Sequence, residues 1–156
     1  MKIRLGMSPI SWSNDDLPQL GGETPLEVCL AETRQSGFTG TENGGKFPTE
    51  AGALKSVLND HDLALVSGWY SGTIINNDLA AEIEQITPQL TLFRDVGAPV
   101  IVYGETYETV QNRQERPLAS RPKLADFDVA AYGRRLTALA EHCADFGVPL
   151  TFHHHM

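Results

Sequence analysis

Apolar and polar positions change their spacing along the chain in a regular order. Short stretches of closely spaced apolar residues predict five strands, at residues 2–7, 38–42, 63–68, 99–104 and 148–155. Between them, apolar residues recur every three or four positions, which predicts four helices. The first begins at Thr24 and ends at Gly37, the second begins at Thr49, and the others span 79–97 and about 128–146. Such alternation is typical of a parallel sheet, so residues 1–156 are predicted to form a single α/β domain.

The ends of these helices carry residues that helix ends favour. In TPLE, residues 24–27, Thr24 is the expected N-cap and Pro25 takes the first helical position. Thr49 is the expected cap of the second helix, and Pro88 is expected to kink the third. Glycine stands where three of the helices give way to strands, in the joins at 36–38, 96–99 and 146–149.

The predicted strands are apolar on both sides. Near-continuous runs such as VIVY, residues 100–103, are expected where a parallel sheet is covered on both faces. This pattern leaves two architectures open, a doubly wound open sheet and part of a (β/α)8 barrel. The order of the strands in the sheet distinguishes them.

Charge and composition narrow the class of partner. The 156 residues carry a formal net charge of −8, which disfavours a nucleic-acid surface and an anionic membrane because both need clustered positive charge. No apolar run approaches the roughly 18 residues of a membrane span, and no secretory signal is recognisable. Cys29 and Cys143 lack C-x-x-C spacing. We therefore expect a cytoplasmic protein with neither a nucleic-acid nor a membrane partner.

Polar and aromatic side chains gather after the strands, whereas the joins before the strands are short. Parallel sheets bind ligands at the carboxyl ends of their strands, so the sequence predicts a small-molecule site there. The phosphate-binding motifs G-x-G-x-x-G and G-x-x-x-x-G-K-[ST] are absent, and so is the nucleophile motif G-x-S-x-G. A nucleotide site and a serine nucleophile are therefore disfavoured.

Three segments resemble one known family. MSPISWSNDDLPQLGGETPLEVCLAETRQSGFTGTENGGKFP, RPLASRP and TFHHHM are similar to the first half of the inosose dehydratases, which are xylose isomerase-like sugar isomerase and epimerase barrels. The resemblance implies a TIM (β/α)8 barrel of which this chain supplies the amino-terminal half, ending in the fifth strand. It also implies a divalent metal, Co²⁺ or Mn²⁺, an association with glutathione, and removal of water from 2-keto-myo-inositol.

The resemblance also suggests roles for residues near the ends of the second and fifth strands. Glu42 and Lys46 match the family's Glu-x-Gly-x-Lys-Phe-Pro pattern, which implies proton transfer or hydroxyl orientation by Glu42 and an electrophilic donor in Lys46; the alternative is a surface pair. In TFHHHM, strand alternation places His153 and His155 on one face. Related barrels carry a metal-binding Glu and a His at these two positions, so His153 is the candidate metal ligand and His155 a candidate substrate contact. Because a (β/α)8 barrel needs about 250 residues, most metal ligands are expected beyond Met156.

Other side chains near the predicted rim are candidates for substrate contact. The aromatic faces of Trp12, Trp69 and Tyr70 suit the C–H surface of a cyclitol, although each also suits a core position. Asn14 is a candidate hydrogen-bonding residue, with an ordinary turn as the alternative. The substrate is thus expected to be a small cyclitol or sugar.

Four interpretations remain open at this stage. The chain is part of a metal-dependent hydro-lyase, part of a sugar isomerase or epimerase of the same family, a non-catalytic half-barrel that associates with itself as a homo-oligomer, or a doubly wound binding module. An unpaired outer strand favours association, because its backbone donors and acceptors remain available. Strand order tests the last of the four.

Overall fold

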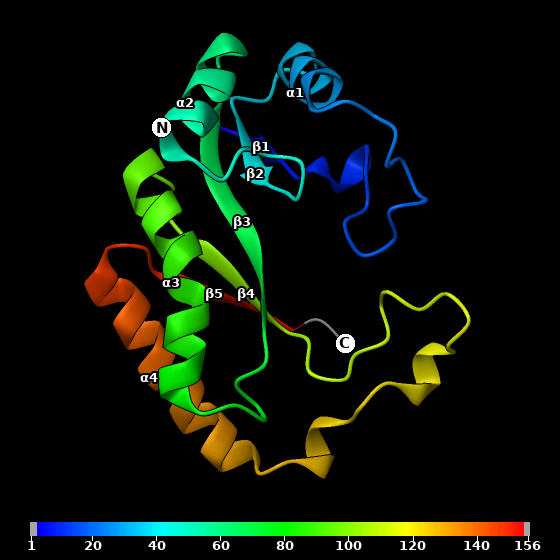
Figure 1. Ribbon diagram of the computed structural model, residues 1–156, viewed down its shortest axis with the longest axis vertical. Helices are drawn as coiled ribbons and strands as arrows, with labels where there is room; N and C mark the ends of the chain where they lie inside the picture. Colours follow the sequence, from blue (N-terminus) through cyan, green and yellow to red (C-terminus); the bar gives the residue numbers. More distant parts are fainter. Residues whose placement is uncertain (1–2, 155–156) are drawn as a thin grey trace.

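The computed structural model describes residues 3–154, which form one parallel sheet with helices on one side of it (Figure 1). The strands are β1 (Gly6–Met7), β2 (Gly40–Asn43), β3 (Ala64–Gly72), β4 (Ile101–Glu105) and β5 (Leu150–His153). The helices are α1 (Leu26–Gln35), α2 (Ala51–Asp60), α3 (Leu79–Val96) and α4 (Val129–Phe146). Short 3-10 helices are η1 (Pro9–Ser11), η2 (Leu118–Ser120) and η3 (Leu124–Asp126).

The strand order answers the question that the sequence left open. The strands lie in the order β1-β2-β3-β4-β5, and every neighbouring pair is parallel. A doubly wound sheet reverses its order at a switch point and carries helices on both faces, whereas a barrel adds each strand beside the preceding one. The fold is therefore half of a TIM-barrel-like α/β structure, as predicted.

The core lies between the sheet and the helices on its convex side. Leu54 of α2, Phe93 of α3 and Leu139 of α4 are fully buried. They belong to one hydrophobic cluster that also contains Ile101 of β4. On the concave side, Val66 fills the space over β1 and β2, since a Cβ added at Gly40 would lie 2.4 Å from its Cγ1. The sheet is thus packed on both faces near the start of its strands. The loops that follow β1 and β4 extend on its open side (Figure 1).

Most helix ends are as predicted, and two caps are not. Gly97 and Gly147 follow α3 and α4 in the left-handed conformation, with φ of 91° and 97°. Thr24 and Thr49, however, do not cap α1 and α2, whose preceding residues are Pro25 and Glu50. Thr24 instead closes a turn, in which its N–H donates to the carbonyl of Gly21 at 3.0 Å.

The bounds of the strands and the effect of Pro88 also differ from the expectation. Within the described residues β1 is limited to Gly6–Met7, shorter than the predicted 2–7. β3 extends to Gly72, so Trp69 and Tyr70 belong to the strand rather than to the loop after it. α3 is assigned without a break through Pro88. No helix within residues 3–154 is both long and apolar enough to cross a membrane.

Candidate functional site

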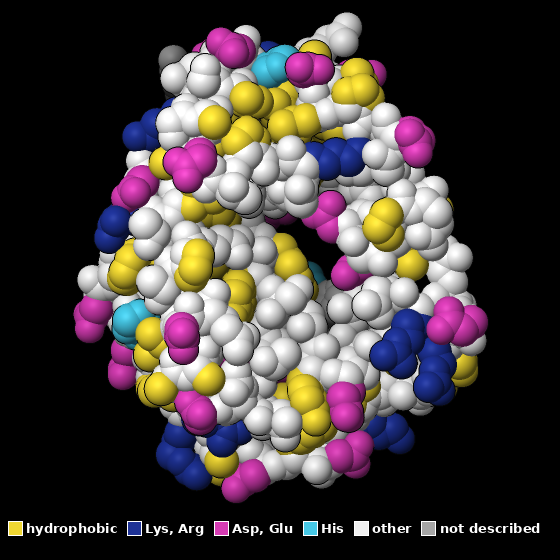
Figure 2. All heavy atoms as spheres, in the orientation of Figure 1, with side chains coloured by type: hydrophobic (Ala, Val, Ile, Leu, Met, Phe, Trp, Pro, Cys, Tyr) yellow, Lys and Arg dark blue, Asp and Glu magenta, His cyan; other side chains and the backbone are white. Residues whose placement is uncertain are grey.

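A cavity of about 800 Å³ opens on the concave side of the sheet, at the carboxyl ends of β2, β3 and β5. Figure 2 shows the molecule hollowed near the middle of the face it presents, with acidic side chains at the margin. Three of the predicted residues that line the cavity come from the strands: Glu42, Trp69 and His153. Asn14 lines it from the β1–α1 loop. The predicted position of a ligand site at this rim agrees with the geometry.

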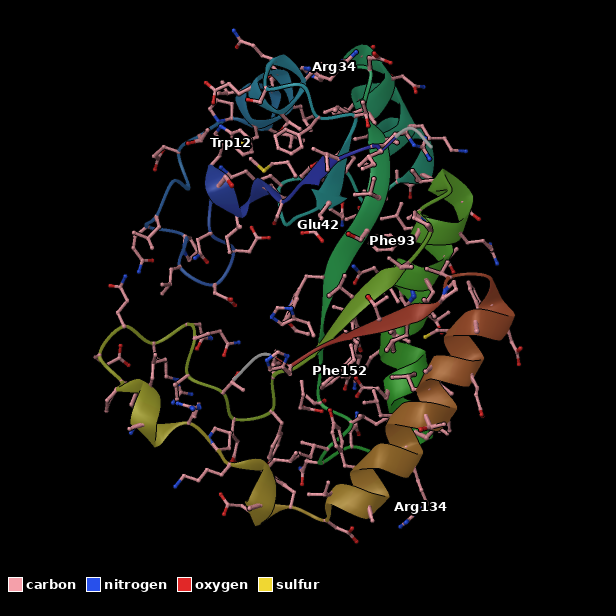
Figure 3. All side chains as sticks on the ribbon, turned by 180° about the vertical axis from the view of Figure 1, so that it is seen from behind. Trp12, Arg34, Glu42, Phe93, Arg134 and Phe152 are labelled. Atoms are coloured by element: carbon pink, nitrogen blue, oxygen red, sulfur yellow. The ribbon has the colours of Figure 1, made fainter. Side chains whose placement is uncertain are left out.

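Glu42 lies at the end of β2, and Figure 3 shows it directed toward the open side of the sheet. The register between β2 and β3 shifts beside it, from Thr41 opposite Leu65 to Glu42 opposite Ser67. This irregularity brings the hydroxyl of Ser67 to 2.7 Å from Oε1 of Glu42, to which it donates a hydrogen bond. One carboxylate oxygen is thus held by the strand alongside while the side chain remains half-buried at the cavity.

Trp69 and His153 form an aromatic corner of the cavity. Their rings meet edge to face, with centroids 5.4 Å apart and an interplanar angle of 75°. The indole Nε1–H of Trp69 donates to Oγ of Ser71 at 2.8 Å, which fixes the ring along the strand. Gly104 of β4 makes room for the indole, because a Cβ there would lie 1.9 Å from a ring carbon.

Asn14 lines the cavity, but its side chain also shapes the loop that carries it. Oδ1 of Asn14 accepts hydrogen bonds from the backbone N–H groups of Asp16, at 2.9 Å, and Leu17, at 3.0 Å. This is the turn geometry that Asn favours. Asp15, next to it, accepts a hydrogen bond from the N–H of Gly45 at 2.7 Å and so joins the β1–α1 loop to the β2–α2 loop.

Three of the predicted site residues lie away from the cavity. Trp12 donates its indole N–H to the carboxylate of Glu32, so that its ring is directed toward α1 (Figure 3). Tyr70 is only 9% exposed and packs in the core on the opposite face of β3 from Trp69. Lys46 directs its ammonium at backbone carbonyls of the β1–α1 loop. His155 lies outside the described residues.

Several residues in or beside the cavity were not predicted from the sequence. Ser67, which does not line the cavity itself, positions Glu42, and Gln89 of α3 lines the cavity and donates to the carbonyl of Trp69 at 3.0 Å. Ser71 could have been found, since it shares a face of the strand with Trp69 at a spacing of two. Gln89 could not, because no local pattern distinguishes it from the other polar residues of its helix.

A metal ion requires more ligands than these residues provide. Within residues 3–154, no three His, Cys, Asp or Glu side chains lie close enough together to hold a metal ion. Glu42 and His153 both line the cavity, but a zinc-type site needs at least three ligands from the protein. The described residues therefore do not fit a metal centre by themselves.

A buried carboxylate network lies against the β3–α3 loop, outside the lining of the cavity. Glu82 of α3 is fully buried and accepts a hydrogen bond from the N–H of Thr73 at 3.1 Å. Glu105 of β4 accepts from the N–H of Ile75 at 3.1 Å, and the hydroxyl of Tyr103 lies within reach of both carboxylates. Burial raises the pKa of Glu105. These contacts hold the β3–α3 loop in place.

Two curated relatives match the whole chain but only about half of their own length. The chain is 51% identical over 156 residues to the rhizopine catabolism protein MocC of Rhizobium meliloti, and covers 48% of it. It is 33% identical over 158 residues to the inosose dehydratase of Geobacillus thermodenitrificans, and covers 52% of it, with 99% of this chain aligned. No protein-family model matches the chain.

Solved structures agree on the fold. The 3-keto-D-glucoside 4-epimerase YcjR of E. coli superposes with a TM-score of 0.62 at 19% identity, covering 97% of this chain and 56% of that one. A xylose isomerase-like TIM barrel protein from Mycobacterium smegmatis in complex with magnesium has a TM-score of 0.61 at 18% identity, covering 96% and 54%. The predicted resemblance is thus confirmed: the chain matches inosose dehydratase over about half of that enzyme's length and has the half-barrel fold of the xylose isomerase-like TIM barrels.

Proposed function

We propose that this chain supplies half of the active site of a hydro-lyase that removes water from 2-keto-myo-inositol. The observation that carries the proposal is the position of Glu42, which is held by Ser67 at a cavity that also contains Trp69 and His153. The match of 99% of the chain to about half of an inosose dehydratase supports the same reaction. A cavity of about 800 Å³ is ample for a six-membered polyol.

The reaction needs three groups acting on one ring. A base removes the proton from the carbon next to the ketone, the resulting enediolate is stabilised, and a hydroxyl leaves with a proton. We assign one of the proton transfers, or the orientation of the leaving hydroxyl, to Glu42. The face of Trp69 receives the C–H surface of the cyclitol, and His153 hydrogen-bonds to one of its hydroxyls.

We also propose that the reaction depends on a divalent metal ion, bound in part by residues outside the described part of this chain. The magnesium complex of the Mycobacterium smegmatis protein supports a divalent ion, and the remaining ligands would have to come from outside residues 3–154. Co²⁺, Mn²⁺ and Mg²⁺ are compared by adding each to a chelator-treated protein, and glutathione is tested by adding or withholding it.

The test is a chimera in which this chain is joined to the part of the Rhizobium meliloti relative that it does not match. We expect the chimera to convert 2-keto-myo-inositol to a product lighter by one water, followed by mass spectrometry and by ultraviolet absorbance of the conjugated product. Glu42→Gln should lower kcat by about 100-fold or more, which is the usual contribution of a general acid or base. Glu50→Gln, an exposed residue before α2, is the matched control and should leave kcat unchanged.

Two results would contradict this proposal. A folded chimera that releases no water, under conditions in which the intact Geobacillus thermodenitrificans enzyme is active, would exclude the reaction. A Glu42→Gln variant with normal kcat would remove Glu42 from the mechanism while leaving the reaction in place.

The main alternative within the same fold is a sugar isomerase or epimerase. Both reactions begin by removing a proton next to a carbonyl, so the same position of Glu42 serves either one. The two are distinguished by the product, because an isomerase or epimerase changes the substrate without changing its mass.

The 51% identity to a rhizopine catabolism protein favours a second substrate for comparison. Rhizopine and 2-keto-myo-inositol are therefore offered to the same chimera. If the chimera converts rhizopine faster than 2-keto-myo-inositol, rhizopine becomes the better candidate for its substrate.

A further inference from the structure

Lys46 was expected to act on the substrate, but its ammonium group is engaged elsewhere. Nζ of Lys46 donates to the carbonyl of Gly22 at 2.8 Å and to that of Thr24, and lies 3.4 Å from the carbonyl of Gly21. A lysine ammonium has three N–H donors, and three carbonyls converge on it here. Lys46 is also absent from the lining of the large cavity.

The turn that presents these carbonyls is closely packed. Gly21 has φ of +77°, and a Cβ there would lie 1.8 Å from the carbonyl oxygen of Trp12. A Cβ at Gly22 would lie 2.2 Å from the carbonyl oxygen of Pro18. Only glycine fits at these two positions, so the β1–α1 loop folds back on itself and presents its carbonyls to Lys46.

A second contact joins the same two loops. The carboxylate of Asp15 accepts a hydrogen bond from the N–H of Gly45, the residue before Lys46, at 2.7 Å. Lys46 holds the far part of the β1–α1 loop, and Asp15 holds the part that lines the cavity. Between the two contacts lies a small gap bordered by Cys29 of α1 and Phe47.

We propose that Lys46 is a positioning residue, which together with Asp15 fastens the β1–α1 loop to the β2–α2 loop and so fixes the cavity wall formed by Asn14, Asp15 and Asp16. The proposal rests on the function proposed above in one respect, namely that this wall meets the substrate. The fastening itself is independent of any activity. Loss of either contact should release the loop while the sheet and its core remain folded.

Cys29 provides a reporter within the chain. Its side chain is 2% exposed and borders the gap beneath the loop, whereas Cys143 belongs to α4 and is fully buried on the core side of that helix. Burial raises the pKa of the Cys29 thiol, and the charge of Lys46 opposes that effect. Removing Lys46 makes the thiol less acidic, which by itself slows its reaction with a thiol reagent. Faster labelling of Cys29 would therefore report opening of the loop.

The experiment compares Lys46→Met with Lys55→Met, an exposed lysine on α2, in the 156-residue chain. We expect Lys46→Met to accelerate maleimide labelling of Cys29 by about tenfold or more, the effect of losing at least one hydrogen bond to a charged group. Labelling of Cys143 and the midpoint of thermal unfolding should be nearly unchanged. Lys55→Met should change neither rate. Asp15→Ala tests the second contact in the same way, and also serves if Lys46→Met does not fold.

The outcomes distinguish the positioning role of Lys46 from the proposed reaction. Unchanged labelling of Cys29 in both Lys46→Met and Asp15→Ala would overturn the proposal. In the chimera described above, a raised KM with a smaller change in kcat would support a positioning role, whereas a collapsed kcat with unchanged KM and unchanged labelling would establish Lys46 as an electrophile instead. Faster labelling of Cys29 in Lys46→Met, together with a chimera that releases no water, would support the positioning role of Lys46 and refute the proposed dehydration.

Discussion

The buried hydroxyl of Tyr103 offers a sharp test of what holds the β3–α3 loop in place. Tyr103 is fully buried in β4, and its hydroxyl accepts a hydrogen bond from the N–H of Ile74 at 3.1 Å. The same hydroxyl lies 3.3 Å from Oε2 of Glu105 and 3.4 Å from Oε1 of Glu82. It has one proton and donates to one carboxylate at a time. Tyr103→Phe removes this hydroxyl and leaves the ring in place.

The cost of Tyr103→Phe can be estimated from these contacts. The N–H of Ile74, a fully buried residue, would lose its acceptor at a cost of about 1–3 kcal/mol, and a hydrogen bond to a carboxylate contributes roughly 1.5–3 kcal/mol. Because the surroundings relax and the two contributions overlap, we expect the free energy of unfolding to fall by about 2–4 kcal/mol. In a domain of this size that corresponds to a decrease in Tm of roughly 5–15 °C.

Tyr132→Phe is the matched control, because Tyr132 carries a buried hydroxyl for which the described residues provide no hydrogen-bond partner. Removing a buried hydroxyl that makes no bond should leave stability unchanged or raise it slightly. Both variants are measured by urea unfolding followed by circular dichroism. The reasoning would be refuted if Tyr103→Phe changed the free energy of unfolding by less than about 0.5 kcal/mol, the range of ordinary surface substitutions, or if the two variants were equally destabilised.

Two further predictions concern neighbours of Tyr103. Burial raises the pKa of Glu105, while backbone N–H groups and the Tyr103 hydroxyl oppose the shift. The Glu105 carboxyl therefore binds its proton more tightly in the folded state than in the unfolded state. The stabilisation that this protonation provides is complete below the unfolded pKa and is lost as pH rises through the folded pKa. The stability of the wild type relative to Glu105→Gln should thus increase as pH falls from 7 toward 4.5 in urea titrations; a constant difference would contradict the assignment. Gly104→Ala should clash with the ring of Trp69, lower stability by about 1–3 kcal/mol and shift the tryptophan fluorescence, whereas Gly133→Ala, with open space at an exposed site of α4, should be neutral or stabilising.

The regular parts of the fold could be predicted because their signals are local. The apolar spacing of α3 and α4 predicts each helix to within about two residues at each end, and Gly97 and Gly147 end them because only glycine adopts positive φ readily. The failed caps have a different cause. Thr24 was expected to cap α1 from its own sequence context, but the helix begins at Leu26, with Pro25 in the cap position. Thr24 belongs instead to a turn closed by its N–H and the carbonyl of Gly21, which the local sequence of the helix does not reveal.

The cavity was harder to predict because the direction of a side chain in a strand depends on register. Leu65 of β3 faces the core, and strict alternation from there would turn Trp69 toward the helices and Tyr70 toward the cavity. The register shift between β2 and β3 reverses this order, so Trp69 lines the cavity and Tyr70 is buried in the core. A shift of one residue changes the face of every residue that follows it. The sequence does not mark the shift, since the residues around Ser67 fit either register.

Glu42 and Lys46 show the same distinction within one motif. Glu42 belongs to a strand whose carboxyl end opens on the cavity, so its place in the sheet determines the direction of its side chain. Lys46 lies three residues beyond that strand, and its direction is determined by the carbonyls of Gly21, Gly22 and Thr24, more than twenty residues earlier in the chain. A spacing of four residues cannot reveal that partner. The motif therefore brings together a residue that faces the cavity and a residue that positions its wall, and labelling of Cys29 in Lys46→Met is the measurement that tells these two roles apart.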